Sequence, residues 1–307
     1  MTKTLILAVT ACILLVSCST SDNTEPQIED EITVDDNQDN PIDEQEEEDG
    51  EVTEINLSYS VFKIFEDGML FRTDTTKFAD NKPIETVRYN SEGAQVNTTI
   101  WYYLQNGLFD SLQTQLPNGL IKVQEKVEYD SEDRLIKWVF SELVDNRTFK
   151  STELYSYPTE NLILTESPDG NASETTFELN ADGLIFKETN GNEINEVVWD
   201  QDYNPIQLTS EDGAFTYELL ENPLKKDYLS NYWINIFKSK NNFILWSNRF
   251  HFSPPELTFG NKYIAVQNGG GLEYEYLYDF DDDGILLKQT TLANGMLQSE
   301  TEYFYEK

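Results

Sequence analysis

The chain has 307 residues, and its 57 Asp and Glu against 21 Lys and Arg give a net charge of −36 at pH 7. This excess of negative charge repels phosphate backbones and anionic headgroups, which excludes nucleic-acid binding as a main role. The single histidine, His251, also excludes zinc sites that need two or three histidine ligands.

Residues 1–17 have the pattern of a bacterial lipoprotein signal peptide. Lys3 precedes an apolar run from Leu5 to Val16. A run of this length is too short for a bilayer core, which takes roughly 20 residues, but it fits the apolar region of a signal peptide. The end of this run, Leu15-Val16-Ser17-Cys18, resembles the lipobox of bacterial lipoproteins. The resemblance implies cleavage before Cys18, acylation of Cys18, and a lipid anchor in the outer membrane on its periplasmic or cell-surface face.

Residues 18–54 form a second segment of different composition. After Cys18 this segment contains sixteen Asp and Glu and no Lys or Arg. So few apolar residues cannot bury enough surface to offset the entropy lost on ordering. We therefore expect a disordered acidic tether between the lipid anchor and residues 55–307.

Residues 55–307 have the composition and periodicity of antiparallel β-strands. The whole chain contains 17 Tyr, 17 Phe and 5 Trp, which are residues favoured in strands. Tyr274, Tyr276, Tyr278 and Phe280 alternate with polar residues, as in strands with one buried face. The sequence therefore predicts an all-β fold, an antiparallel meander of hairpins in one extended or curled sheet.

Asx-Gly pairs separate the expected strands, and several belong to a degenerate repeat that begins with an aromatic or apolar residue and Asp or Asn. Such pairs supply the positive φ angles of tight hairpins. The segment Tyr129 to Leu135 resembles a YD (RHS-type) repeat unit, with Asp133 in place of its glycine. Similar degenerate repeats occur in Bacteroidota-type surface lipoproteins of unassigned function. The resemblance implies consecutive hairpins and no catalytic residue.

Residues 223–240 interrupt the strand pattern and predict one short helix or a long loop. The surrounding segment 224–262 is locally basic and aromatic, and aromatic side chains beside polar groups can bind a protein or a glycan. The binding candidates in this segment are Tyr232, Trp233, Lys238, Lys240 and Trp246. A core insert with solvated lysines is the competing interpretation.

The stretch Asp279 to Gly284 resembles the start of a calcium-binding loop. Asp279, Asp281 and Asp283 stand at the first, third and fifth positions and Gly284 at the sixth. Position twelve is Thr290 where such loops need Glu, and a strand pattern follows instead of a helix. The motif therefore leaves two interpretations open, a Ca²⁺ site and an acidic hairpin turn.

We expect a non-catalytic, monomeric cell-envelope lipoprotein that binds a protein or a glycan and needs no cofactor. Two alternatives stay open, a carboxylate-based glycan hydrolase and a calcium-stabilised structural module. The hydrolase needs two carboxyl groups held together in a cleft, and no local motif selects such a pair.

Overall fold

The computed structural model describes residues 56–170, 174–210, 213–221, 237, 239–247, 262–269 and 271–306. The strands are β1 (Asn56–Glu66), β2 (Met69–Ala79), β3 (Lys82–Asn90), β4 (Gln95–Tyr103), β5 (Phe109–Gln115), β6 (Ile121–Tyr129), β7 (Leu135–Val144), β8 (Arg147–Thr159), β9 (Leu162–Glu166), β10 (Thr175–Leu179), β11 (Ile185–Asn190), β12 (Glu193–Trp199), β13 (Pro205–Ser210), β14 (Gly213–Glu221), β15 (Lys262–Gly269), β16 (Leu272–Phe280), β17 (Leu286–Ala293) and β18 (Met296–Glu306). One helix, α2 (Lys240–Ser247), occurs among these residues.

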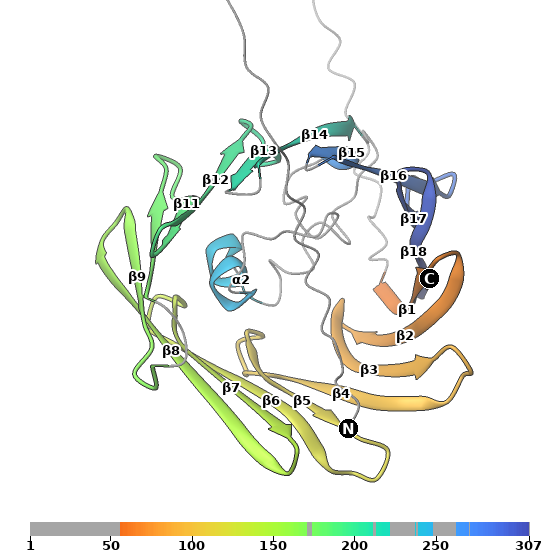
Figure 1. Cartoon of the computed structure of the whole chain (residues 1–307), viewed down its shortest axis with the longest axis horizontal. Helices are drawn as coiled ribbons and strands as arrows, with labels where there is room; N and C mark the ends of the chain where they lie inside the picture. The colour runs from red at the N-terminus through yellow and green to blue at the C-terminus, as the bar shows by residue number, and fades with distance from the viewer. Residues whose placement is uncertain are drawn as a thin grey trace, which may run out of the picture. The chain divides into compact units, whose positions relative to one another are not determined.

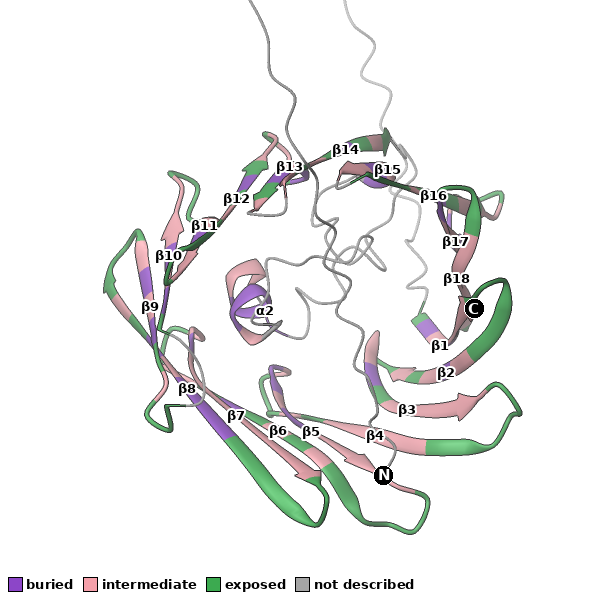
Figure 2. Cartoon of the chain, viewed as in Figure 1, coloured by how far each residue is buried: buried purple, intermediate pink, exposed green. Residues whose placement is uncertain are grey.

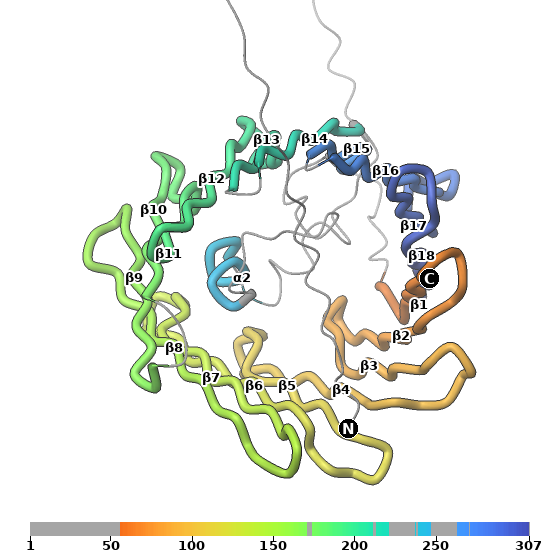
Figure 3. The backbone as a smooth tube through the Cα atoms, viewed as in Figure 1, coloured from red at the N-terminus to blue at the C-terminus, as the bar shows by residue number. Residues whose placement is uncertain are grey.

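The strands form a closed barrel. Every strand pairs with the next in an antiparallel ladder, and β18 pairs with β1, so the 18-stranded sheet has no free edge (Figure 1). The tube in Figure 3 shows the same ring as one hairpin after another. The predicted meander of hairpins is confirmed, and the curled sheet closes on itself. Closure satisfies backbone groups that an open edge would expose.

Tight turns explain why neighbouring strands pair in this order. Asp67 and Gly68 join β1 to β2 with φ values of 50° and 75°, and Asn294 and Gly295 join β17 to β18 with 48° and 77°. Two consecutive residues with positive φ match the right-handed twist of the flanking strands. These two Asx-Gly pairs therefore act as the hairpin turns that the sequence predicted.

The two faces of the sheet differ in polarity. One continuous cluster of buried residues lines the inside, including Phe109, Leu135, Phe177 and Ile264, and the α2 residues Phe243, Ile244 and Leu245 belong to it. The outside carries ion pairs across neighbouring strands, such as Lys77–Glu85 and Lys137–Glu128. The tyrosine row of β16 faces inwards, because Tyr276 belongs to the cluster and Tyr274 and Tyr278 pack against it.

Helix α2 lies inside the ring of strands (Figure 1). It belongs to the insert that connects Glu221 at the end of β14 to Lys262 at the start of β15. The predicted helix or loop at 223–240 falls mostly outside the described residues, and the helix that is described begins at Lys240. Figure 2 shows buried residues on α2 and exposed residues in the projecting hairpins of β5 to β8.

Antiparallel connectivity gives the barrel two different ends. At the end that we call the insert end, β1 begins at Asn56, β14 ends and β15 begins. At the opposite end, which we call the free end, lie the hairpin turns that join β1 to β2, β5 to β6, β7 to β8 and β17 to β18. No helix in the described part of the chain is long and apolar enough to cross a membrane.

Candidate functional site

Five hairpin turns share one hydrogen-bond pattern, which gives the degenerate repeat a physical basis. In the turn after β6, the Asp130 carboxylate accepts the backbone N–H groups of Glu132 and Arg134 at 2.9 and 3.0 Å. The same two contacts, to the residues two and four positions later, recur at Asn90, Asn180, Asp200 and Asp281. Asp and Asn side chains that bond their own following backbone stabilise turns in this way.

The fourth residue of each of these turns adopts a positive φ. It is Gly93, Gly183 or Gly284 in three of them, with φ between 74° and 79°. Asp133 and Tyr203 hold the equivalent place with φ of 59° and 63°. Asp133 therefore replaces the glycine of the repeat unit without changing the backbone shape. The cost is the strain that a positive φ imposes on a residue with a side chain.

At the insert end, six of the described strands have an aromatic residue at or near their last position that donates a hydrogen bond to the backbone of the neighbouring strand. The Tyr129 hydroxyl donates to the carbonyl of Phe109 at 2.9 Å, and the Tyr157 hydroxyl donates to the carbonyl of Leu135 at 2.8 Å. Equivalent bonds link Tyr103 to Pro83, Trp199 to Ile185, Tyr278 to Ile264, and Tyr305 to Leu286. Tyr129 and Trp199 directly precede two of the repeated turns, so in these two repeats the aromatic residue ties one hairpin to the preceding one.

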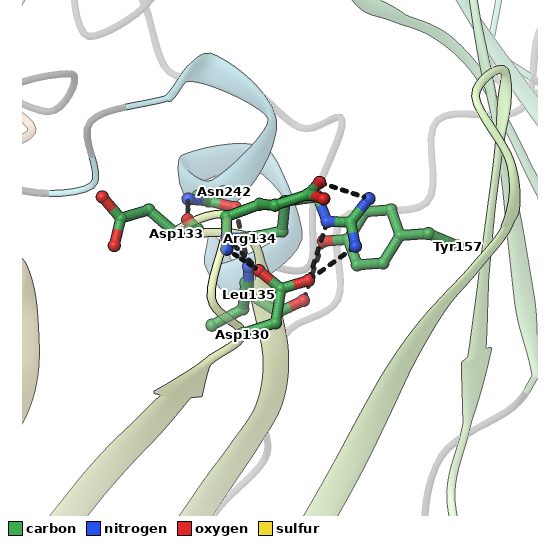
Figure 4. Close-up of polar contacts among 7 residues, drawn as sticks. Asp130, Asp133, Arg134, Leu135, Tyr157 and Asn242 are labelled. Atoms are coloured by element: carbon green, nitrogen blue, oxygen red, sulfur yellow. Dashed lines mark hydrogen bonds and ion pairs between the residues drawn. The ribbon is translucent and has the colours of Figure 1, made fainter.

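Helix α2 docks on two of these turns through adjacent asparagines. Asn242 accepts the Leu135 N–H at 2.9 Å and donates to the Asp133 carbonyl at 2.7 Å (Figure 4). Asn241 makes the equivalent bonds to the β10–β11 turn, with the Ile185 N–H at 3.1 Å and the Gly183 carbonyl at 2.6 Å. Each side-chain amide thus accepts one backbone N–H and donates to one backbone carbonyl of its turn, as the backbone of a paired strand does.

The first of these turns also contains a charged cluster. Arg134 forms ion pairs with Asp130 at 2.7 Å and Glu132 at 3.0 Å, and its guanidinium lies 4.6 Å from the centre of the Tyr157 ring (Figure 4). Burial raises the pKa of Asp130, but the hydrogen bonds from the backbone and side chain of Arg134 outweigh it, and the pKa is lowered overall. The Asp130 carboxylate therefore stays charged in its turn.

Aromatic side chains of the insert pack inside the barrel beside this docking site. Phe237, Phe243 and Trp246 pack on one another and Phe237 and Trp246 contact Phe109 of β5, with ring centroids 5.1 to 6.3 Å apart. The Tyr155 hydroxyl lies 2.9 Å from the Leu245 carbonyl. The insert therefore forms part of the core at this end of the barrel.

The predicted binding residues are only partly described. Trp246 lies in the aromatic core just named, and the Lys240 ammonium lies 4.2 Å from the centre of the Tyr203 ring. Burial lowers the pKa of Lys240 to about 8, against the opposing charge of Asp200. Tyr232, Trp233 and Lys238 lie outside the described residues. The docking roles of Asn241 and Asn242 were not predicted, since no local pattern marks an amide that bonds a turn 50 or more residues away.

Two glutamates on the inner face of the barrel are the carboxyl groups to consider for the hydrolase alternative. Glu125 of β6 accepts the Trp138 indole N–H at 3.1 Å, and Glu153 of β8 lies 2.8 Å from the Tyr155 hydroxyl. Strand β7 separates them, and they are offset by two residues along it because Glu125 pairs with Phe140 and Glu153 with Trp138, which places their backbones about 12 Å apart. Glu153 is only 4% exposed. A substrate could therefore reach both carboxyl groups only after α2 and its neighbours moved.

Two of the proposed calcium ligands, Asp281 and Asp283, lie in one of the five repeated turns, whereas Asp279 is an exposed residue of strand β16 opposite Lys288. Asp281 uses one carboxylate oxygen to accept the N–H groups of Asp283 and Ile285 at 3.0 and 2.8 Å. Within the described ranges, no group of three or more His, Cys, Asp or Glu side chains is arranged to hold a metal ion. The hairpin-turn interpretation accounts for Asp281 without an ion.

Comparisons with known proteins give only distant likenesses. No family model and no curated protein matches the sequence. Similar solved structures include a porin-like protein from Bacteroides uniformis ATCC 8492 (14% identity, 81% of this chain and 98% of that chain, TM-score 0.28) and one from Bacteroides vulgatus ATCC 8482 (12% identity, 82% and 99%, TM-score 0.35). The TcdB2-TccC3-TEV structure matches at 13% identity over 78% of this chain and 11% of that one, with a TM-score of 0.24. At these TM-scores the likenesses assign neither a family nor a function.

Proposed function

We propose that this chain is a non-catalytic cell-envelope lipoprotein whose barrel presents its free end to a protein partner. In this proposal Cys18 carries the lipid anchor in the outer membrane, and residues 18–54 form the tether. The barrel is the frame, and α2 is docked on two of its turns at the insert end. No cofactor takes part.

The observation that carries the proposal is the placement of two connections at the same end. The first strand begins at Asn56, so a tether that precedes it joins the barrel at the insert end. The insert between Glu221 and Lys262 is joined to the barrel at that end as well. Neither the tether nor the insert is joined to the barrel at its free end, so the hairpin turns there carry no covalent connection to either.

The free end has the exposed apolar side chains that a protein interface needs. Met69 at the β1–β2 turn is 71% exposed, Met296 at the β17–β18 turn is 62% exposed, and Phe149 near the β7–β8 turn is 47% exposed. Interface cores are enriched in aromatic residues and methionine. Apolar side chains gathered at hairpin tips support a protein partner more than a glycan with its many hydroxyl groups.

A cross-linked pull-down from the native envelope tests the proposal, with the full lipoprotein as bait. We expect one specific partner that is lost with Met69→Ser and Phe149→Ser. Leu287→Ser is the matched control, because Leu287 is 41% exposed but lies in a strand that begins at the insert end. Lys240→Gln tests the predicted insert surface.

Recovery of the same partner with all of these variants would contradict a free-end interface. Loss only with Lys240→Gln would place the interface on the insert. Recovery of no partner, with binding of envelope glycans instead, would replace the protein ligand by a sugar.

The glycan hydrolase is the second candidate, because Glu125 and Glu153 face the same interior. Its test is the release of reducing ends from envelope glycans by the full chain. Activity that disappears with Glu153→Gln while the protein stays folded would establish the enzyme and overturn the non-catalytic proposal.

A further inference from the structure

Arg72, Asp74 and Arg88 lie on the inner face of the barrel, which follows from a chain of cross-strand contacts. Leu112 belongs to the core, and Thr114 shares its face two residues further along β5. The Thr114 and Thr99 hydroxyls are 2.8 Å apart. Residues opposite each other in neighbouring strands share a face.

The same contacts continue across β3 to β2. Thr99 pairs with Thr86, and the Thr86 and Thr76 hydroxyls are 3.0 Å apart. Asp74 stands two residues before Thr76 and pairs with Arg88. All of these side chains therefore face inwards, in the half of β2 and β3 that is nearer the free end.

The charges of these three side chains do not cancel. Asp74 is 7% exposed and binds Arg88 through two bonds, Nε to Oδ1 at 2.9 Å and Nη2 to Oδ2 at 2.8 Å. Arg72 approaches the same carboxylate through its Nε, at 3.4 Å from Oδ2. One carboxylate thus faces two guanidinium groups, so the group of three carries a net positive charge.

Arg72 has one guanidinium nitrogen that no described acceptor satisfies. Its Nε is buried without meeting hydrogen-bond geometry, while 27% of its side chain is exposed to solvent. Burial lowers the pKa of Arg72, the charge of Asp74 raises it, and the charge of Arg88 lowers it again. A guanidinium fork matches the geometry of a carboxylate or a sulfate, which could add a second negative charge here.

We propose that Arg72 and Arg88 form an oxyanion-binding site on the inner wall near the free end, for a carboxylate or sulfate group of a small ligand such as an acidic sugar. Asp74 orients Arg88 and leaves the Arg72 fork open to the ligand. The site is local positive charge in a strongly acidic protein, which favours a small anionic ligand over an extended polyanion. It needs neither the lipid anchor nor the protein partner proposed above.

Thermal unfolding of the full chain tests this site with sodium sulfate, sodium glucuronate and neutral glucose, at constant ionic strength. An oxyanion at about ten times its Kd should raise Tm by about 3 °C, and glucose should not. Arg72→Gln should lose the shift, because Asp74 and Arg88 remain paired and the strands stay joined. Arg72→Lys, which keeps the charge without the fork, should retain part of it.

Lys77→Gln is the matched control. Lys77 lies on the outer face of the same strand, paired with Glu85 at 2.6 Å, and its loss removes the same charge without touching the site. Lys77→Gln should therefore keep the full shift in Tm. The difference between Lys77→Gln and Arg72→Gln then excludes the general stabilising effect of sulfate, which is the same for both variants. A larger shift with glucuronate than with sulfate would identify a sugar acid as the ligand class, and the reverse would identify an inorganic oxyanion. Equal shifts in Arg72→Gln and the parent protein, or no shift with either oxyanion, would overturn the proposal.

Discussion

The side-chain amide of Asn242 is hydrogen-bonded to the backbone N–H of Leu135 at 2.9 Å, across 107 residues of sequence. The same amide donates to the carbonyls of Asp133 and Phe237 at 2.7 and 3.0 Å. One side chain thus holds the insert and a barrel turn in register. Its neighbour Asn241 repeats the arrangement on the turn before Ile185.

Asn242→Ala should lower the free energy of unfolding by about 2–4 kcal/mol. The substitution leaves buried backbone donors and acceptors without partners, and each such group costs about 1–3 kcal/mol. Urea unfolding monitored by tryptophan fluorescence measures the loss. Asn241→Ala is the internal comparison and should cost less, because Asn241 is partly exposed and water can replace its bonds. Equal stability of the parent and Asn242→Ala would mean that the docking contributes nothing.

Asp133→Gly should raise the free energy of unfolding by about 0.5–1 kcal/mol. Asp133 holds a φ of 59° at the place where Gly183 has 74°, and glycine adopts this region without the cost that a Cβ imposes. The reciprocal change, Gly183→Asp, should lower stability by a similar amount. Chemical denaturation of the two variants gives both values, and effects of the same sign would show that φ strain is not the cause.

The periodicity of the sequence was sufficient to predict the strands, because a half-buried strand alternates at every second residue. Tyr274, Tyr276 and Tyr278 face inwards as that period requires. The Asx-Gly pairs likewise predicted turns, because positive φ is a local requirement. These features depend on residues close together in the chain.

Contacts between distant segments could not be predicted in the same way. The pairing of β1 with β18 joins Asn56 to Glu306, and nothing in either strand specifies that partner. Bulges near most turns, such as the one between Asp279 and Phe280, change the register of the strands. The joint placement of Arg72 and Arg88 around Asp74 depends on that register, so the inner-wall site became visible only in three dimensions.

Calcium at millimolar concentration should leave Tm unchanged within error. Asp281 already accepts two backbone N–H groups, as Asp130 and Asp200 do in turns without the Asp-rich motif. A ligand that binds only the folded state raises Tm by an amount that grows with the logarithm of one plus the ratio of ligand concentration to Kd. Differential scanning calorimetry with Ca²⁺ or EDTA checks this outcome. A rise with Ca²⁺ that disappears in Asp281→Asn would support the calcium-stabilised module instead.

Glu125→Gln should stabilise the protein at neutral pH and have less effect in acid. Burial raises the pKa of Glu125, against the opposing hydrogen bonds of Trp138 and Trp246. An unfolded Glu titrates near 4.3, so the folded state holds its proton to a higher pH. The stabilisation that protonated Glu125 gives the folded state is therefore complete below about pH 4.3 and is lost as pH rises through the folded pKa.

Glutamine keeps an acceptor for the Trp138 indole and removes the buried charge. Thermal unfolding of both proteins from pH 4 to 8 should show the parent losing Tm relative to Glu125→Gln as pH rises. A constant difference across this range would mean that Glu125 has the same pKa in the folded and unfolded states.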